Sequence, residues 1–255
     1  MSLSSDVKRV ALEEGADLVG VAGVDAFEQA PEGCRPWDIL PGAKAIVVAA
    51  KHVPRGVMQS PNLRVYRSSA RFIEEELTGV SHQVAYYLES RGYLASPVQP
   101  DIPIDMERSV PILGDLSHKH AAAEAGLGII GASSLLITPQ FGPRLRLVSV
   151  VTDAPLEPGC KLDVDFCRAC SACLEACPAG AIQKVGGLDK GKCIRGCMPH
   201  SVGGLLKFIR EFMEIEDREE RVKKLRDPRL FDFHQYLRTG GYTCARCVKI
   251  CPVGK

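Results

Sequence analysis

The sequence has no long apolar run, few aromatic residues and no excess of charge of either sign. Its N-terminus, Met1 to Arg9, has neither the apolar core of a signal peptide nor a twin-arginine pair, and the apolar stretch from Ala45 to Ala50 is too short to cross a membrane. Lys and Arg number 32 against 31 Asp and Glu, so neither a nucleic-acid surface nor an acidic tail is indicated. We therefore expect a cytoplasmic protein with no membrane association.

Cysteine is the exception to this plain composition, because nine of the eleven cysteines lie from Cys167 onward. The run from Cys167 to Pro178 reads C-x2-C-x2-C-x3-C-P, the spacing with which bacterial-type ferredoxins hold cubane iron–sulfur clusters, the fourth cysteine binding a second cluster. The run from Cys244 to Pro252 repeats the last part, C-x2-C-x3-C-P. Gly241 stands where its first cysteine would be, so one ligand must come from elsewhere.

We assign four cysteines to each of two [4Fe-4S] clusters. One takes Cys167, Cys170, Cys173 and Cys251, and the other takes Cys177, Cys193, Cys244 and Cys247. Cys34, Cys160 and Cys197 are left over, and the sequence does not separate Cys193 from Cys197 as the detached ligand. Zinc and disulfides are the alternatives, but neither requires the C-x3-C-P ending, which occurs twice. Reduced thiols and clusters also suit the cytoplasm and indicate an oxygen-sensitive protein that works anaerobically.

The chain before the cysteine runs alternates helices and strands, which predicts an α/β layered domain. Helices are expected over 5–14, 69–91 and 117–125, and strands over 18–22, 43–50, 94–98, 134–138 and 144–152, the last two forming a hairpin. Leu156 to Gly159 marks a boundary, so the predicted domains are 1–155 and 156–255. A further helix over 202–225 has an apolar stripe that we expect to pack on the first domain or on the clusters, a partner surface being the alternative. The stripe comprises Leu205, Leu206, Ile209, Phe212 and Met213.

Gly126 to Gly131 matches G-x-G-x-x-G letter for letter. The dinucleotide fingerprint needs a strand before the glycines and a helix after them, whereas here the predicted order is reversed. The motif therefore does not predict a Rossmann site.

The block from His118 to Leu147, with its Ala-Gly-Leu-Gly run at 125–128 and Ile-Thr-Pro-Gln-Phe-Gly-Pro-Arg at 137–144, is followed by the cysteine run. Together they closely resemble the corrinoid-dependent iron–sulfur reductases, which comprise epoxyqueuosine reductases and reductive dehalogenases. The resemblance covers about 113–255 and, more loosely, Leu40 to Ala45. It implies an α/β (α+β) chain: a nitroreductase-like domain that cradles cobalamin, then a two-cluster ferredoxin domain with Cys193 among its ligands.

The resemblance also implies a reaction in which a low-potential cluster passes single electrons to cobalt and a nearby acid protonates a small-molecule substrate. A ferredoxin or flavodoxin would supply the electrons. Asp115, His118 and Lys119 are the candidate proton donors, although Asp115 stands about three residues nearer the glycines than the family's aspartate and could instead cap a helix. Small residues let the backbone approach a flat ring such as a corrin. At each of these positions the alternative is that the residue only forms a tight structural turn. The expected corrin contacts are Gly126, Gly128, Gly131, Ala132 and Ser133, with Thr138, Gly142 and Arg144 behind them.

The chain departs from both branches of the family. Epoxyqueuosine reductases carry further C-terminal helical repeats that help bind transfer RNA, whereas this chain stops four residues after Cys251, so we expect transfer RNA not to be the substrate. Dehalogenases usually carry an export signal, which is lacking here. Two alternatives remain: a non-catalytic electron-transfer protein that serves a partner enzyme, and a flavin in place of the corrin. Arg64, Arg67 and Arg71 would bind the flavin phosphate.

Overall fold

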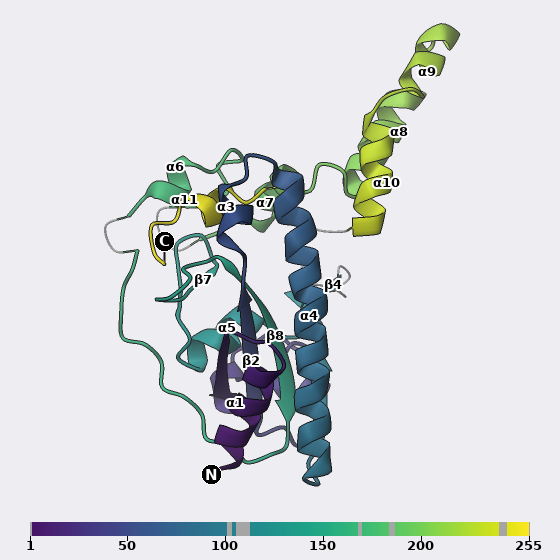
Figure 1. Cartoon of the computed structure of the whole chain (residues 1–255). Coiled ribbons are helices and arrows are strands. Elements are labelled where there is room, and N and C mark those ends of the chain that lie inside the picture. The colour runs from purple at the N-terminus through teal and green to yellow at the C-terminus, as the bar shows by residue number, and fades with distance from the viewer. Residues whose placement is uncertain are drawn as a thin grey trace.

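A four-stranded antiparallel sheet lies at the centre of the computed structural model, which describes residues 2–100, 104–105, 113–167, 170–183, 187–239 and 244–254 (Figure 1). The strand order is β1-β2-β8-β3, with β1 at Leu18–Gly23, β2 at Ala45–His52, β3 at Ala95–Val98 and β8 at Leu145–Thr152. The two central strands, β2 and β8, pair along their whole length. Most residues of both strands are apolar, as expected of strands that are covered on both faces.

Helices cover the two faces of the sheet and bury alternate residues of each strand. Helices α1 (Leu3–Glu13) and α4 (Leu63–Ser90) pack with Val47 and Val150 in one core cluster. Helix α5 (His118–Glu124) packs with Val48 and Val151 in the other. The two-residue period of strands sends neighbouring side chains to opposite faces. The short helices η1 (Val24–Phe27) and α2 (Pro36–Ile39) close the α5 side.

The structure confirms the helices and long strands that the sequence predicts, with shifted ends. Helix α1 begins at Leu3 because the Ser2 hydroxyl accepts a hydrogen bond from the Ser5 amide, and α4 begins at Leu63 because the Asn62 side chain caps the Arg64 amide. Pro97 lies inside β3, which is an edge strand. A proline is tolerated there because an edge strand leaves one row of amides unpaired.

Two predictions about chain connection are wrong. Strand β7 (Leu136–Ile137) pairs with β6 (Ile129–Ile130) and not with β8, so the expected hairpin does not form; Thr138 instead bridges Gly142 and closes a tight turn. The helix expected over 202–225 is divided into α8 (Val202–Met213) and α9 (Arg218–Lys224), because the Asp217 carboxylate caps a new helix by accepting from the Glu220 amide. Two short strands, β4 (Ile104–Asp105) and β5 (Leu113–Gly114), also pair.

The cysteine-bearing elements gather over one end of the sheet. After β8 an extended segment runs back beside the sheet to that end, where α6 (Ala172–Glu175), α7 (Lys190–Cys197) and α11 (Arg246–Ile250) lie close to α3 (Arg55–Gln59) (Figure 1). The Lys249 ammonium donates to the Ser60 carbonyl at 2.5 Å, which ties α11 to the chain just after α3. Segments far apart in sequence therefore build one cysteine-rich cap.

Helices α8, α9 and α10 (Arg229–Thr239) project from this cap as an arm (Figure 1). Phe208 of α8 and Phe233 of α10 are buried and pack edge to face at 5.9 Å between ring centroids. Leu206, Ile209 and Met213 are exposed, so the prediction that their stripe packs on the first domain or on the clusters is wrong. None of the described helices has the length and apolar composition needed to span a membrane.

Candidate metal centre

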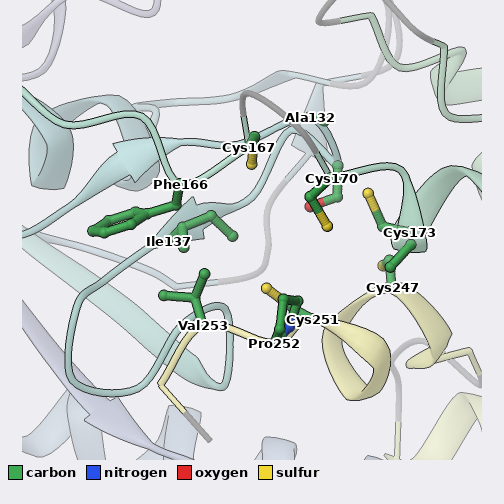
Figure 2. A pocket seen from close by; sticks show the side chains of 12 residues that line it. Ala132, Ile137, Phe166, Cys167, Cys170, Cys173, Cys247, Cys251, Pro252 and Val253 are labelled. Atoms are coloured by element: carbon green, nitrogen blue, oxygen red, sulfur yellow. The ribbon is translucent and has the colours of Figure 1, made fainter.

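Five cysteines line one small hollow, partly open to solvent, in the cap over the sheet. They are Cys167, Cys170, Cys173, Cys247 and Cys251. Figure 2 shows their sulfur atoms around a common space, with Ala132, Ile137, Phe166 and Val253 completing the wall. Two cysteine runs about eighty residues apart in sequence are thus brought to one site beside the loop that follows β6.

The local backbone explains how the thiols come to face inward. The Cys170 amide donates to the Cys167 carbonyl at 3.0 Å, a tight turn that brings neighbouring cysteines to the same side. Helix α11 ends at Ile250 with Cys251 as its C-cap, because Pro252 cannot continue a helix. Burial raises the pKa of Cys173 and of Cys251, and the neighbouring thiolates add to the shift of both. A neutral thiol is favoured there until a cation is bound.

Arg144 holds the loop that carries Cys251. Its guanidinium donates to the carbonyls of Val248 at 3.3 Å and Cys251 at 3.0 Å, and to that of Val253. Burial lowers the pKa of Arg144, while the nearby Cys251 thiolate acts in the opposite direction. Gly142 adds a close backbone contact, since its φ is +56° and a Cβ there would lie 2.1 Å from the Val253 oxygen. The sheet end and the last cysteine are therefore locked together.

Close contacts within the protein explain why glycine occupies the positions of the G-x-G-x-x-G run. A Cβ on Gly126, whose φ is +77°, would lie 2.2 Å from the Cys160 carbonyl oxygen, and one on Gly128 would lie 2.3 Å from that of Ile137. A Cβ on Gly131 would lie 2.6 Å from Ile137 and 3.2 Å from the Cys167 sulfur. The space that a side chain would need at these three positions is occupied by atoms of the same chain.

This packing bears on the fit of a corrin. Thr138 is buried and accepts from the Phe141 amide through its hydroxyl, and Arg144 and Gly142 contact the C-terminal loop. Of the eight residues expected against a corrin, only Ala132 and Ser133 line the hollow. The hollow is lined mainly by the cysteines and their neighbours, so the other six expected corrin contacts stay predictions.

The candidate proton donors on α5 have defined partners. The His118 ring donates through Nε2 to the Gln99 carbonyl at 2.9 Å, which leaves Nδ1 to accept from the Ser149 hydroxyl at 2.8 Å, and burial lowers its pKa. Lys119 Nζ donates to the carbonyl and hydroxyl of Ser134, each at 2.7 Å, and burial lowers its pKa, with a smaller effect of Lys190. Asp115 is half-buried just after β5.

A second group of thiols lies at helix α7. Cys193 and Cys197 project from the same side of the helix with their sulfur atoms 3.6 Å apart, and Cys197 also hydrogen-bonds to Cys244. These bonds lower the pKa of Cys193 to about 7 and that of Cys244 to about 6, and they raise the pKa of Cys197. The Cys177 sulfur accepts from the Ala181 amide at 3.3 Å.

Cys247 lies between the two groups. It lines the hollow, burial raises its pKa to about 12, and the charges of Cys244, Cys193 and Cys173 contribute to that shift. None of the eleven cysteines forms a disulfide, so the disulfide alternative is wrong. Thiolates are the ligands of iron–sulfur clusters, so the residue type of both groups suits that chemistry. No three Cys, His, Asp or Glu side chains of the described residues are arranged to hold a single metal ion.

Two of the three arginines of the flavin alternative have partners elsewhere, and Arg64 is exposed. Arg67 donates to the Gln235 carbonyl at 3.2 Å and lies over the Tyr236 ring, and Arg71 pairs with Glu75 at 2.8 Å. Sequence reasoning missed the hydrogen bonds of Arg144 to the C-terminal loop and the contact between Cys197 and Cys244. Neither lies close in sequence to all of its partners, so no local pattern could have revealed them.

Known proteins with similar sequences are iron–sulfur proteins and reductases. The family model described as a 4Fe-4S binding domain matches residues 161–183, so the cysteine region is of the iron–sulfur type. Among curated proteins, the epoxyqueuosine reductase of Bacillus cereus is 26% identical over 281 residues, covering 99% of this chain and 65% of that protein. The tetrachloroethene reductive dehalogenase of Desulfitobacterium hafniense is 42% identical over 174 residues, covering 65% of this chain and 28% of that protein.

Solved structures show the same fold. An epoxyqueuosine reductase with a transfer RNA stem loop has a TM-score of 0.64 at 20% identity, covering 99% of this chain and 65% of that one. A reductive dehalogenase described in terms of B12-dependent dehalogenation has a TM-score of 0.58 at 20% identity, covering 95% and 36%. The RNA-bound neighbour weighs against the expectation that transfer RNA is not a substrate.

The predicted resemblance to the corrinoid-dependent iron–sulfur reductases is therefore confirmed, and it extends to both branches of that superfamily. The chain spans about two thirds of the length of the epoxyqueuosine reductase and under a third of that of the dehalogenase, 65% and 28% respectively.

Proposed function

We propose that this chain is an iron–sulfur reductase that passes single electrons through two [4Fe-4S] clusters to a bound acceptor. The observation that carries the proposal is the hollow in which five cysteines from two distant runs face Ala132 and Ser133, the loop next to the sheet. Electrons delivered to that site would reach an acceptor held by the sheet-bearing part of the chain. We divide the chain accordingly into residues 1–155, proposed to be nitroreductase-like, and 156–255.

The proposed ligand sets follow the two groups of thiols. Cys167, Cys170, Cys173 and Cys251 hold one cluster at the hollow, and Cys177, Cys193, Cys244 and Cys247 hold the other beside α7. The hydrogen bonds from Arg144 keep Cys251 in place for the first cluster. Cys247 lines the hollow of the first cluster, and its pKa responds to the charges of Cys193 and Cys244 of the second group.

Cobalamin is the acceptor that the reductive dehalogenase neighbours suggest, and when bound it would supply a cobalt centre that carries out the one-electron and two-electron chemistry. Ala132 and Ser133 are the residues proposed to contact it. Gly126, Gly128 and Gly142 act instead by close backbone packing that shapes the site from behind.

Asp115 is the proposed proton donor. His118 is neutral, and its ring proton is already donated to the Gln99 carbonyl, so it acts as a positioning residue for α5. Lys119 is held by Ser134 and directs its positive charge toward the loop that leads from the glycines to β7. A positive charge there would favour an anionic substrate or product.

The electrons would come from a low-potential donor, a ferredoxin or a flavodoxin, in a reducing compartment such as the cytoplasm. A small molecule is the proposed substrate, and the RNA-bound neighbour makes a transfer RNA stem loop the second candidate. The non-catalytic electron carrier is not favoured, since the named relatives are reductases.

Anaerobic reconstitution with iron, sulfide and hydroxocobalamin tests the proposal. After gel filtration we expect about eight irons per chain, an electron paramagnetic resonance signal from reduced cubane clusters, and one retained cobalt. The Cys251→Ser variant should hold about four irons, and the Cys160→Ser variant should match the parent. Retention of zinc in place of iron would reject the cluster assignment. Eight irons with no retained cobalt would reject the corrinoid reductase and leave an electron carrier.

A further inference from the structure

The cysteine cap contains one thiol more than two cubane clusters require. Nine cysteines lie from Cys167 to Cys251, whereas two [4Fe-4S] clusters bind eight. The surplus residue, Cys197, is not remote from the others: its sulfur lies 3.6 Å from that of Cys193 and hydrogen-bonds to Cys244, both proposed ligands of the second cluster.

Helix α7 places the thiols of Cys193 and Cys197 on the same face and at a similar depth. Residues four positions apart on an α-helix lie on one face, one turn from each other, so Cys193 and Cys197 point to the same side. Both side chains are half-buried to a similar degree. Rotation about χ1 changes where each sulfur points without moving the helix, so either thiol can turn toward the side on which Cys244 lies.

The helix is also anchored against the segment that follows Cys177. The Asp189 carboxylate caps it by accepting from the Lys192 amide at 2.8 Å, and the Asp189 amide donates to the Ala181 carbonyl at 2.9 Å. At the other end a Cβ on Gly196 would lie 2.9 Å from the Ala179 side chain, so the helix approaches that turn closely. The pair of thiols is therefore held at a constant place relative to Cys177.

We propose that Cys193 and Cys197 form an interchangeable ligand pair for the second cluster, either of them completing the set of Cys177, Cys244 and Cys247. The inference rests on the two-cluster function proposed above. In the exchange one iron–sulfur bond to Cys193 breaks, one to Cys197 forms, and the proton of Cys197 passes to Cys193. No electron is gained or lost, and the reverse step restores the first state.

Iron content distinguishes an interchangeable pair from a single ligand. After anaerobic reconstitution, Cys193→Ala and Cys197→Ala should each retain about eight irons with altered resonance signals of the second cluster, and the double variant should retain about four. Cys160→Ala, which removes an exposed thiol outside the cap, is the matched control. The inference is overturned if one single variant falls to about four irons while the other keeps eight, or if the double variant keeps eight.

Alkylation of the parent protein supplies a second measurement that needs no substitution. Iodoacetamide added anaerobically to the reconstituted protein modifies unligated thiols, and peptide mass spectrometry locates the label. We expect label on Cys193 in some molecules and on Cys197 in others, never on both. Label confined to one of the two would overturn the inference. Failure of both the parent and Cys160→Ala to reach about eight irons would instead overturn the two-cluster proposal, and this inference with it.

Discussion

Replacing Arg144 should release the C-terminal cysteine from its cluster while leaving the sheet intact. Arg144→Met keeps most of the apolar stem but removes the donors to the carbonyls of Val248, Cys251 and Val253. A hydrogen bond from a charged donor contributes about 1.5–3 kcal/mol, and a buried acceptor left unpaired costs about 1–3 kcal/mol. Because the loop is only half-buried and water replaces part of the loss, we expect about 2–4 kcal/mol in total.

That loss should appear both in stability and in iron content. For a chain of this size about 1 kcal/mol corresponds to about 2–4 °C in Tm, so the expected decrease is about 4–16 °C. The same free energy would favour release of the loop by about 30-fold to 1,000-fold, at about 1.4 kcal/mol for each factor of ten. Reconstituted Arg144→Met should therefore hold about four irons, and Arg144→Lys, which retains the charge but not the fork of donors, should be intermediate.

Arg146→Met is the matched control, because Arg146 lies two residues further along the chain, in β8, and pairs with Glu74 of α4 at 3.2 Å. It should lower Tm while leaving the iron count at the parent value. Thermal unfolding by circular dichroism, iron analysis and hydrogen exchange of residues 246–254 would measure the three effects. If Arg144→Met retains about eight irons and the parent Tm within about 2 °C, the proposed anchoring role is refuted.

Three further predictions follow from packing and charge. Gly126→Ala should lower the free energy of unfolding by more than about 2 kcal/mol, because its φ is positive and the new Cβ would meet the Cys160 carbonyl. Gly79→Ala, inside α4 with nothing within 4 Å of a Cβ, should raise it by about 0.5–1 kcal/mol. Equal effects of the two substitutions on urea unfolding would contradict the packing argument. Burial lowers the pKa of His118, so the unfolded chain binds a proton at this ring more tightly than the folded chain does. The neutral ring therefore contributes to the free energy of unfolding above about pH 6.5, and this contribution is lost as pH falls below that value, by up to about 1.4 kcal/mol per pH unit. A His118→Gln variant whose stability has the same pH slope as the parent would refute this. Phe208→Ala should lower the free energy of unfolding by about 3–5 kcal/mol, because the ring is buried. Met213→Ala should change Tm little, because that side chain is 71% exposed. Thermal scans that show the reverse order would mean that the arm packs differently in solution.

Local patterns in the sequence were enough to predict much of the fold. The apolar periodicity of 69–91 and the continuous apolar runs that became β2 and β8 produce a helix and buried strands because those residues must be covered wherever they lie. The cysteine spacing likewise predicted an iron–sulfur region, since three thiols within seven residues of a tight turn can only face a common centre. Caps moved the helix ends by a few residues, which a pattern of apolar residues does not reveal.

The tertiary structure decided which distant segments meet. Strand β7 pairs with β6 because the turn from Thr138 to Gly142 closes on itself, and the arm exposes a stripe that its periodicity alone predicted to be buried. Arg144 reaches the Cys251 carbonyl across 107 residues, and Cys197 meets Cys244, which follows the arm in the sequence. Hydrogen bonds and close contacts of this kind act over a few ångströms in space whatever the separation along the chain. The residue types that build the site could therefore be predicted from the sequence, and their partners only from the folded chain.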